Sequence, residues 1–178
     1  MTIIYIRHAE KLFSNGTPGQ EYSHDPDITD DGVLEANILG VKLIEKYGIP
    51  NVIYCSPLLR TRETLNSLLG KVDDVKNVVA YCDIRIGEYF GHWKAEDVVL
   101  TPETRSYSLI VDDIKSFKKR VDNFHQELIR DKKEDQIIWV VTHGICLKFI
   151  SVKYGFKLKH VPYLGYFEIN GEFLTSGF

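Results

Sequence analysis

The chain has 178 residues, of which 44% are apolar and 26% charged, a composition typical of a folded globular protein rather than a disordered or collagen-like one. Its net charge of −3 argues against non-specific nucleic-acid binding, which requires a basic surface. No apolar run approaches the ~20 residues of a membrane span, and the start lacks the basic and apolar regions of a secretory signal. We therefore expect one domain over residues 1–178 in the cytoplasm, without nucleic-acid or membrane partners, and we leave its oligomeric state open.

The first half of the chain alternates short apolar runs with amphipathic stretches. Continuous runs of β-branched and aromatic residues are typical of strands buried on both faces of a parallel sheet. Thr29 supplies an N-cap for the first helix, which Gly48 and Pro50 stop, and Pro57 suits the first turn of the second helix. In chain order, the expected elements are a strand over 3–6, a loop over 14–29, a helix over 30–47, a strand over 52–55, a helix over 56–70 and a strand over 78–81.

The second half repeats this pattern and closes with a hairpin. Apolar residues from Ile110 to Leu128, spaced alternately by four and three, form one face of a long helix. Strand and helix in repeated alternation predict a single α/β domain of three layers, with a mostly parallel central sheet and helices on both faces. In chain order, the expected elements are a loop over 87–107, a helix over 110–128, a strand over 137–142, a helix over 144–155 and a hairpin of strands at 166–169 and 172–174.

Three cysteines are too few and too scattered for a disulfide framework, and their spacing matches no zinc-site pattern. We expect Cys55, Cys82 and Cys146 to be small core residues in a reducing compartment.

Cationic and imidazole side chains follow the predicted strands. Arg7 and His8 end the first strand, Arg60 lies one turn into the helix after the second, and His143 ends the fourth. Because the carboxyl ends of parallel strands meet at one edge of a sheet, these side chains are expected to converge. Arginine holds phosphate oxygens with a planar fork, and a histidine with one nitrogen fixed can attack with the other. The arrangement suits a dianionic phosphoryl group.

Four blocks, in chain order, resemble signatures of the histidine phosphatase superfamily, which is also called phosphoglycerate mutase-like. The matching blocks span most of the chain, and each lies at a predicted strand end or helix start. Residues 7–10 (R-H-A-E) resemble R-H-G-E, residues 27–36 (D-I-T-D-D-G-V-L-E-A) resemble P-L-T-x-x-G-x-x-Q-A, residues 56–64 (S-P-L-L-R-T-R-E-T) resemble S-P-L-x-R-A-x-Q-T, and residues 140–144 (V-V-T-H-G) resemble V-x-H-G.

The resemblance implies the phosphoglycerate mutase-like fold and a phosphatase that needs neither metal nor cofactor. His8 would attack phosphorus and become phosphohistidine. Arg7, Arg60 and His143 would bind the phosphoryl oxygens and stabilise the transition state, so His143 is expected to be both phosphate-binding and catalytic. A carboxylic acid would protonate the leaving oxygen and then activate the hydrolytic water. The partner would be a phosphorylated small molecule or a phosphoprotein.

The acid is the point at which this sequence departs from the family pattern, which has L-x-E, a short loop and then F-G-x-W. Glu88 fits the first part and residues 90–93 (F-G-H-W) fit the second, but the loop between them is one residue short. We expect Glu88 to be the acid, because a carboxylate one residue from its usual place requires only a loop adjustment. Asp83, Glu96 or the lack of any acid are the alternatives.

The leading hypothesis is metal-independent hydrolysis of phosphomonoesters through phosphohistidine at His8. A protein-phosphohistidine phosphatase is the second, because a P–N bond has a good leaving group and needs less help from an acid. A phosphoglycerate mutase is less favoured, since mutases of this kind carry insertions for which the chain has little room. The retained histidines and arginines disfavour an inactive phosphate-binding module. A metallohydrolase is disfavoured because the sequence shows no H-E-x-x-H motif or clustered ligands.

Overall fold

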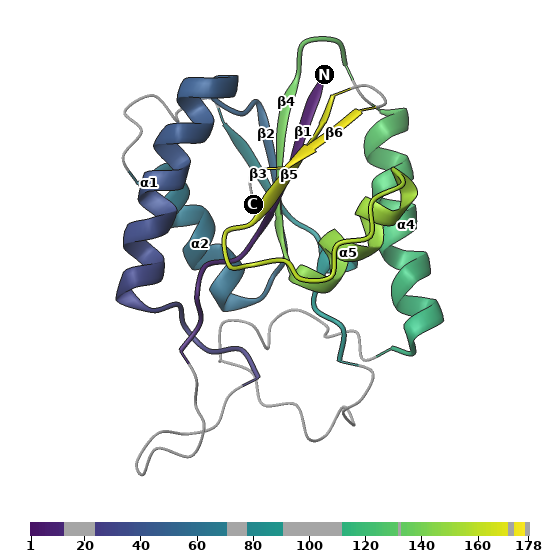
Figure 1. The fold of residues 1–178 in the computed structure, drawn as a ribbon, viewed down its shortest axis with the longest axis horizontal. Coiled ribbons are helices and arrows are strands. Elements are labelled where there is room, and N and C mark those ends of the chain that lie inside the picture. The colour runs from purple at the N-terminus through teal and green to yellow at the C-terminus, as the bar shows by residue number, and fades with distance from the viewer. Residues whose placement is uncertain (13–23, 71–77, 91–111, 132, 171–172, 177–178) are drawn as a thin grey trace.

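The apolar runs form one central sheet that lies between two sets of helices (Figure 1). The computed structural model describes residues 1–12, 24–70, 78–90, 112–131, 133–170 and 173–176. The strands are β1 (Thr2–Arg7), β2 (Val52–Cys55), β3 (Val79–Cys82), β4 (Ile137–Thr142), β5 (Tyr166–Asn170) and β6 (Phe173–Ser176).

The strand order is β3-β2-β4-β1-β5-β6. Strands β3, β2, β4 and β1 are parallel to their neighbours, whereas β5 runs antiparallel to β1 and β6 antiparallel to β5. The register pairs Arg7 of β1 with Thr142 of β4 and Cys55 of β2 with Val141 of β4. The carboxyl ends of these three strands therefore lie level at one edge of the sheet, where the site was predicted.

Helices cover both faces of the sheet. Because side chains alternate along a strand, Ile4 and Ile6 of β1 pack towards α1 and α2, while Ile3 and Tyr5 pack towards α4 and α5. The predicted three-layer α/β domain with a mostly parallel sheet is thus confirmed. The helices are α1 (Asp30–Tyr47), α2 (Leu59–Leu69), α4 (Ile114–Arg130) and α5 (Gly144–Lys153), with a short 3-10 turn η1 (Ile84–Ile86) before the site.

Most predicted elements lie within two residues of the observed ones. Helix α2 begins at Leu59 rather than at residue 56, because Pro57 and the N-cap residue Leu58 form a bend before it. Strand β6 begins one residue later and ends two residues later than predicted. Ile114 at the start of α4 was expected on the buried face but is 43% exposed. Helix α4 begins at Ile114, after its N-cap Asp113, and not at residue 110 as predicted. Residues 110–111 and most of the two predicted loops lie outside the described residues.

The three cysteines differ in burial. Cys55 and Cys146 are buried, as expected, but Cys82 is exposed, so its prediction as a core residue is wrong. Cys82 lies on β3, an edge strand with four exposed residues, which explains the difference. Among the described residues, no helix has both the length and the apolar character needed to cross a membrane.

A buried histidine links β1 to the helices on one face of the sheet. His125 of α4 is 1% exposed, and its Nδ1 and Nε2 lie 2.8 Å and 3.1 Å from the hydroxyl oxygens of Tyr5 and Tyr154. Burial, aided by the charge of Lys153, lowers the pKa of His125 to about 4. The ring is therefore neutral at physiological pH and is satisfied by the two tyrosines.

Helices α1 and α2 make a close contact at Gly40 on the opposite face. A Cβ atom at this position would lie 1.9 Å from the backbone oxygen of Leu68, far inside van der Waals contact. The missing side chain is what permits this helix separation, and α2 in turn carries Arg60 to the site.

Candidate active site

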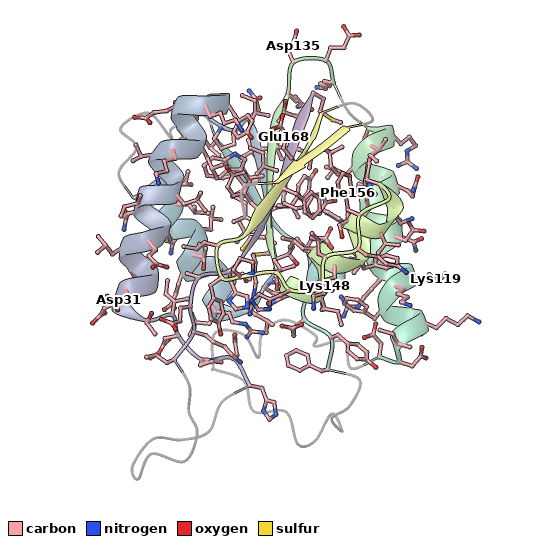
Figure 2. The ribbon with its side chains drawn as sticks, viewed as in Figure 1. Asp31, Lys119, Asp135, Lys148, Phe156 and Glu168 are labelled. Carbon is pink, nitrogen blue, oxygen red and sulfur yellow. The ribbon has the colours of Figure 1, made fainter. Side chains whose placement is uncertain are left out.

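The predicted site residues converge at the carboxyl ends of β1, β2 and β4. His8 continues the pairing of β1, because its backbone N–H donates to the carbonyl oxygen of Thr142 at 3.0 Å. His143 directly follows β4, and the centroids of the two imidazole rings are 5.4 Å apart. Figure 2 shows nitrogen-bearing side chains gathered at this end of the sheet. The sheet register thus places two imidazoles next to each other.

His8 is buried and has a defined tautomer. Its Nδ1 lies 2.8 Å from the carbonyl oxygen of Ala9, which can only accept, so Nδ1 carries the proton and Nε2 keeps its lone pair. Burial, followed by the charges of Arg60 and His143, lowers the pKa of His8 well below its usual 6.5. A neutral imidazole with a free Nε2 is the form that can act as a nucleophile.

Arg7 lies beside His8 and is held by the chain segment before β5. Its Nη1 donates to the carbonyl oxygen of Val161, and its guanidinium lies 4.1 Å over the ring of Tyr163. Gly144 at the start of α5 allows this placement, because a Cβ there would lie 3.3 Å from Arg7 Nε. Within the described part of the chain, Arg7 Nε has no hydrogen-bond partner, which leaves a donor for a ligand oxygen.

Arg60 brings a second guanidinium into the group from the first turn of α2. It is 2% exposed, and its Nη1 lies 3.1 Å from Asp25 Oδ1 and 3.2 Å from the carbonyl oxygen of His24. Its Nη2 lies 3.4 Å from Glu88 Oε2. Arg60 Nε, like Arg7 Nε, has no partner among the described residues. Two arginines therefore present donors that the rest of the described structure does not use.

Asp25 joins Arg60 to the N-terminus of its own helix. The N-cap residue Leu58 makes no side-chain hydrogen bond, so α2 lacks a local cap. Both carboxylate oxygens of Asp25 accept from the backbone N–H of Leu59, at 2.8 Å and 3.0 Å. The carboxylate is fully buried and serves as a cap supplied from an earlier segment of the chain.

His143 is fully buried between a hydroxyl and a carboxylate. Its Nε2 lies 2.8 Å from Ser56 Oγ, and its Nδ1 lies 3.3 Å from Glu88 Oε2, without hydrogen-bond geometry. Burial lowers the pKa of His143, and the neighbouring Glu88 charge opposes this only in part.

Glu88 reaches the group from the segment after η1. Its Oε1 accepts from the N–H of Tyr89 at 3.1 Å, while Oε2 lies between Arg60 and His143. Partial burial raises the pKa of Glu88, but His143, Arg60 and His8 outweigh this effect and lower it well below its usual value. Glu88 is therefore ionised in the free protein. The shorter loop noted in the sequence does not keep this carboxylate away from the other site residues.

The two alternative acids differ from Glu88 in position. Asp83 caps η1 and pairs with Arg85, whose Nη2 lies 2.7 Å from its Oδ2. Its carboxylate is thus committed to a local ion pair. Glu96 lies outside the described residues.

With this geometry in place, comparison with known proteins identifies the family. A family model of the histidine phosphatase superfamily (branch 1) matches residues 3–164. The chain belongs to this superfamily. Family membership and the phosphatase names of its relatives support a hydrolytic phosphatase.

Two relatives with phosphatase names are similar over most of this chain. A 5''-phosphoribostamycin phosphatase of Niallia circulans is 29% identical over 167 residues, covering 83% of this chain and 75% of the relative. The mitochondrial serine/threonine-protein phosphatase Pgam5 of Drosophila mojavensis is 29% identical over 176 residues, covering 94% of this chain but only 54% of the relative. The match to Pgam5 thus spans about half of that protein.

Solved structures show the same fold. The ecdysone phosphate phosphatase of Bombix mori superimposes with a TM-score of 0.69 at 16% identity, covering 98% of this chain and 91% of that one. A putative alpha-ribazole-5'-P phosphatase of Escherichia coli gives a TM-score of 0.67 at 21% identity, covering 99% and 94%. The arrangement of layers described above is therefore that of histidine phosphatases.

The structure brings together a set of possible metal ligands that the sequence did not reveal as a motif. One ligand atom each of His8, Glu88 and His143 lies within 4.8 Å of the others. The same group contains Arg60, whose guanidinium is ion-paired to Glu88. A permanent cation beside the ligand atoms repels a divalent ion and competes for the carboxylate, so the residues fit an anion better than a metal.

Sequence reasoning missed Asp25 and the contact of Ser56 with His143. Neither residue type is unusual in a loop or turn, so no local pattern marks them. One weak signal for Asp25 lies at the start of α2, where the N-cap residue Leu58 has no side-chain acceptor. A helix that carries a site arginine and lacks its own cap indicates that a carboxylate or hydroxyl from elsewhere supplies one.

Proposed function

We propose that the protein is a metal-independent phosphatase that hydrolyses phosphomonoesters through a phosphohistidine at His8. The observation that carries this proposal is the hydrogen bond from His8 Nδ1 to the Ala9 carbonyl oxygen, which leaves Nε2 free among cationic groups. Membership of the histidine phosphatase superfamily supports the same reaction class.

Substrate binding uses the donors that the described structure leaves unpaired. Arg7 and Arg60 each have an Nε without a partner, and both guanidinium groups are permanently charged. These two groups and His143 bind the non-bridging oxygens of the phosphoryl group. Because the donors are held by contacts elsewhere in the protein, they stabilise transition-state charge without reorganising.

In the first step, Nε2 of His8 attacks phosphorus in line as the ester P–O bond breaks. Glu88 donates its proton to the leaving oxygen, so the product departs as a neutral alcohol. Glu88 is ionised in the free protein, and the arriving phosphate dianion offsets the cations around it and raises its pKa. Protonation of the acid is thereby coupled to substrate binding.

In the second step, the Glu88 carboxylate accepts a proton from water as the water oxygen attacks the phosphohistidine. The P–N bond breaks, His8 regains its lone pair and inorganic phosphate leaves. One carboxyl group therefore serves as acid and then as base.

The substrate itself is a phosphorylated small molecule or a phosphoprotein. The names of the two relatives, a 5''-phosphoribostamycin phosphatase and a serine/threonine-protein phosphatase, support a phosphorylated substrate of either kind. The ionised state of Glu88 favours one second candidate, a protein-phosphohistidine phosphatase, because a P–N bond needs little acid assistance. Turnover of a panel of phosphorylated metabolites and a phosphohistidine peptide separates these candidates.

The proposal is tested by hydrolysis of p-nitrophenyl phosphate by wild type, His8→Ala and the matched exposed control His160→Ala. Wild type and control should turn over equally in EDTA, and vanadate should inhibit competitively. His8→Ala should fold but retain less than about 1% of the rate, and wild type should trap an acid-labile phosphoryl adduct. A folded His8→Ala variant with substantial activity, or loss with EDTA and rescue by a divalent ion, would refute the mechanism.

A further inference from the structure

The segment that carries Glu88 is held by side chains at every backbone carbonyl from residue 85 to residue 88. Arg120 of α4 donates to the carbonyl oxygens of Arg85 (2.8 Å), Gly87 (3.0 Å) and Glu88 (3.0 Å). Thr142 at the end of β4 donates through Oγ1 to the remaining one, that of Ile86, at 2.6 Å. The segment contains only one 3-10 turn, so these side chains provide its fixed geometry.

The guanidinium of Arg120 is itself held rigidly. Its Nε lies 2.8 Å from Asp112 Oδ2 and its Nη2 lies 3.4 Å from Asp112 Oδ1. It also lies 4.7 Å over the ring of Phe117, and the two side chains of the ion pair are 9% and 8% exposed. Arg120 is therefore a buried structural cation whose donors are taken up by Asp112 and by the carbonyl groups of residues 85–88.

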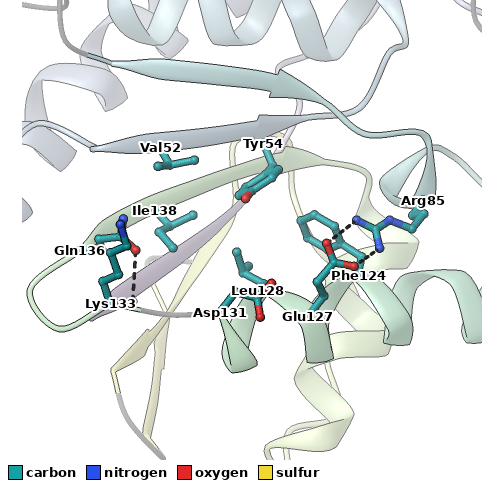
Figure 3. A pocket seen from close by; sticks show the side chains of 10 residues that line it. All are labelled: Val52, Tyr54, Arg85, Phe124, Glu127, Leu128, Asp131, Lys133, Gln136 and Ile138. Atoms are coloured by element: carbon teal, nitrogen blue, oxygen red, sulfur yellow. Dashed lines mark hydrogen bonds and ion pairs between the residues drawn. The ribbon is translucent and has the colours of Figure 1, made fainter.

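Helix α4 makes a second contact with residues 85–88, an ion pair that is much more exposed to solvent than the Arg120 contacts. Arg85 lies 2.6 Å from Glu127, at the rim of a cavity lined by Tyr54, Phe124 and Ile138 (Figure 3). The Glu127 side chain is 48% exposed, so solvent screens the pair and its contribution is small. The buried Arg120 contacts are what fix the segment against α4.

We infer that Arg120 is a positioning residue that sets the Glu88 carboxylate between Arg60 and His143. The inference rests on the proposed role of Glu88 as acid and base. The planar fork of Arg120 holds three carbonyl oxygens and one carboxylate at once, a set that a lysine ammonium cannot span. Loss of the fork lets residues 85–88 move, and the carboxylate moves with them.

The inference is tested with Arg120→Lys, which keeps the charge and shortens the reach. The matched control is Arg130→Lys, on the same helix but 73% exposed. Single-turnover release of the leaving group is measured with an alkyl phosphate and with p-nitrophenyl phosphate. A 1 Å displacement costs about 10²-fold, so Arg120→Lys should slow alkyl phosphate by about this factor. It should slow p-nitrophenyl phosphate, whose leaving group needs no proton, several-fold less.

A double variant makes the test specific to Glu88. If Arg120 acts through Glu88, then Glu88→Gln with Arg120→Lys should be no slower on alkyl phosphate than Glu88→Gln alone. Multiplicative losses, or equal losses on both substrates by Arg120→Lys, would overturn the inference. A Glu88→Gln variant that keeps full alkyl phosphate turnover would instead refute the proposed acid. Because this result needs no Arg120 variant, it is distinguished from failure of the positioning role.

A second substitution keeps the test decisive if Arg120→Lys fails to fold. Asp112→Asn leaves the three carbonyl contacts possible but removes the carboxylate that anchors the guanidinium. It should slow alkyl phosphate by about 10-fold, with p-nitrophenyl phosphate less affected, since positional effects of this kind are graded. Equal effects on both substrates, or none on either, would refute the positioning role.

Discussion

Removal of the Asp25 carboxylate should weaken the fold and the phosphate site together. Asp25→Ala deletes the acceptor for the Leu59 N–H at the start of α2 and one of the two carboxylate partners of Arg60. A helix cap contributes about 1 kcal/mol, and a buried hydrogen bond to a charged group contributes about 1.5–3 kcal/mol. We therefore expect the free energy of unfolding to fall by about 3 kcal/mol.

Thermal unfolding measures this change. For a chain of this size 1 kcal/mol corresponds to about 3 °C, so Asp25→Ala should lower Tm by about 9 °C. The exposed Glu45→Ala on α1 is the control and should stay within about 0.5 kcal/mol of wild type.

The effect of inorganic phosphate on Tm tests whether the loss of stability involves the anion site. The added anion gives Arg60 a new partner, so saturating phosphate should raise the Tm of Asp25→Ala by more than that of wild type. An Asp25→Ala protein with wild-type Tm would refute the capping argument. An equal phosphate-induced rise in both proteins would refute the link between Asp25 and the anion site.

Three further predictions concern pH and close contacts. The pKa of His125 is about 4 in the folded protein against 6.5 when unfolded, so the unfolded chain binds more protons between these values. Stability should fall by about 3 kcal/mol as pH drops through this window, and His125→Gln should remove that part of the pH dependence in denaturant titrations. Gly40→Ala forces α1 away from Leu68 and should cost about 1–3 kcal/mol, measured by urea unfolding. Gly144→Ala crowds Arg7 and should lower kcat/KM by about 10-fold with little change in Tm.

Each of these predictions has a control and a contradicting result. His160→Gln, at an exposed site, should leave the pH profile unchanged, and a His125→Gln protein with an unaltered slope would contradict the assigned pKa. Asn66→Ala on the exposed side of α2 is the control for Gly40→Ala. A Gly40→Ala protein with wild-type stability would show that the two helices can move apart without cost. For Gly144→Ala, an unchanged kcat/KM would show that Arg7 can shift without loss.

The sequence predicted those elements and site residues that a local pattern marks. It did not predict the side-chain positions that depend on contacts with distant segments of the chain. Strand β4 is a continuous apolar run and was placed to the residue, and His8 and His143 followed from strand ends. Arg120 lies in a run with Lys118 and Lys119, and nothing local shows that it alone turns inward to Asp112. The placement of Glu88 likewise depended on an inference across a shortened loop, because its position is set by α4 rather than by its neighbours.

The parallel register of β1 and β4 has a consequence for engineering. Both imidazoles extend from strands whose hydrogen bonds align Arg7 with Thr142, so a one-residue insertion in either strand would turn an imidazole to the opposite face. Segments outside the strands do not set this spacing. A library that keeps the strands and the site residues His8, Arg60, Glu88 and His143, and randomises other loop positions, can therefore change which molecule is recognised while the two imidazoles keep their spacing.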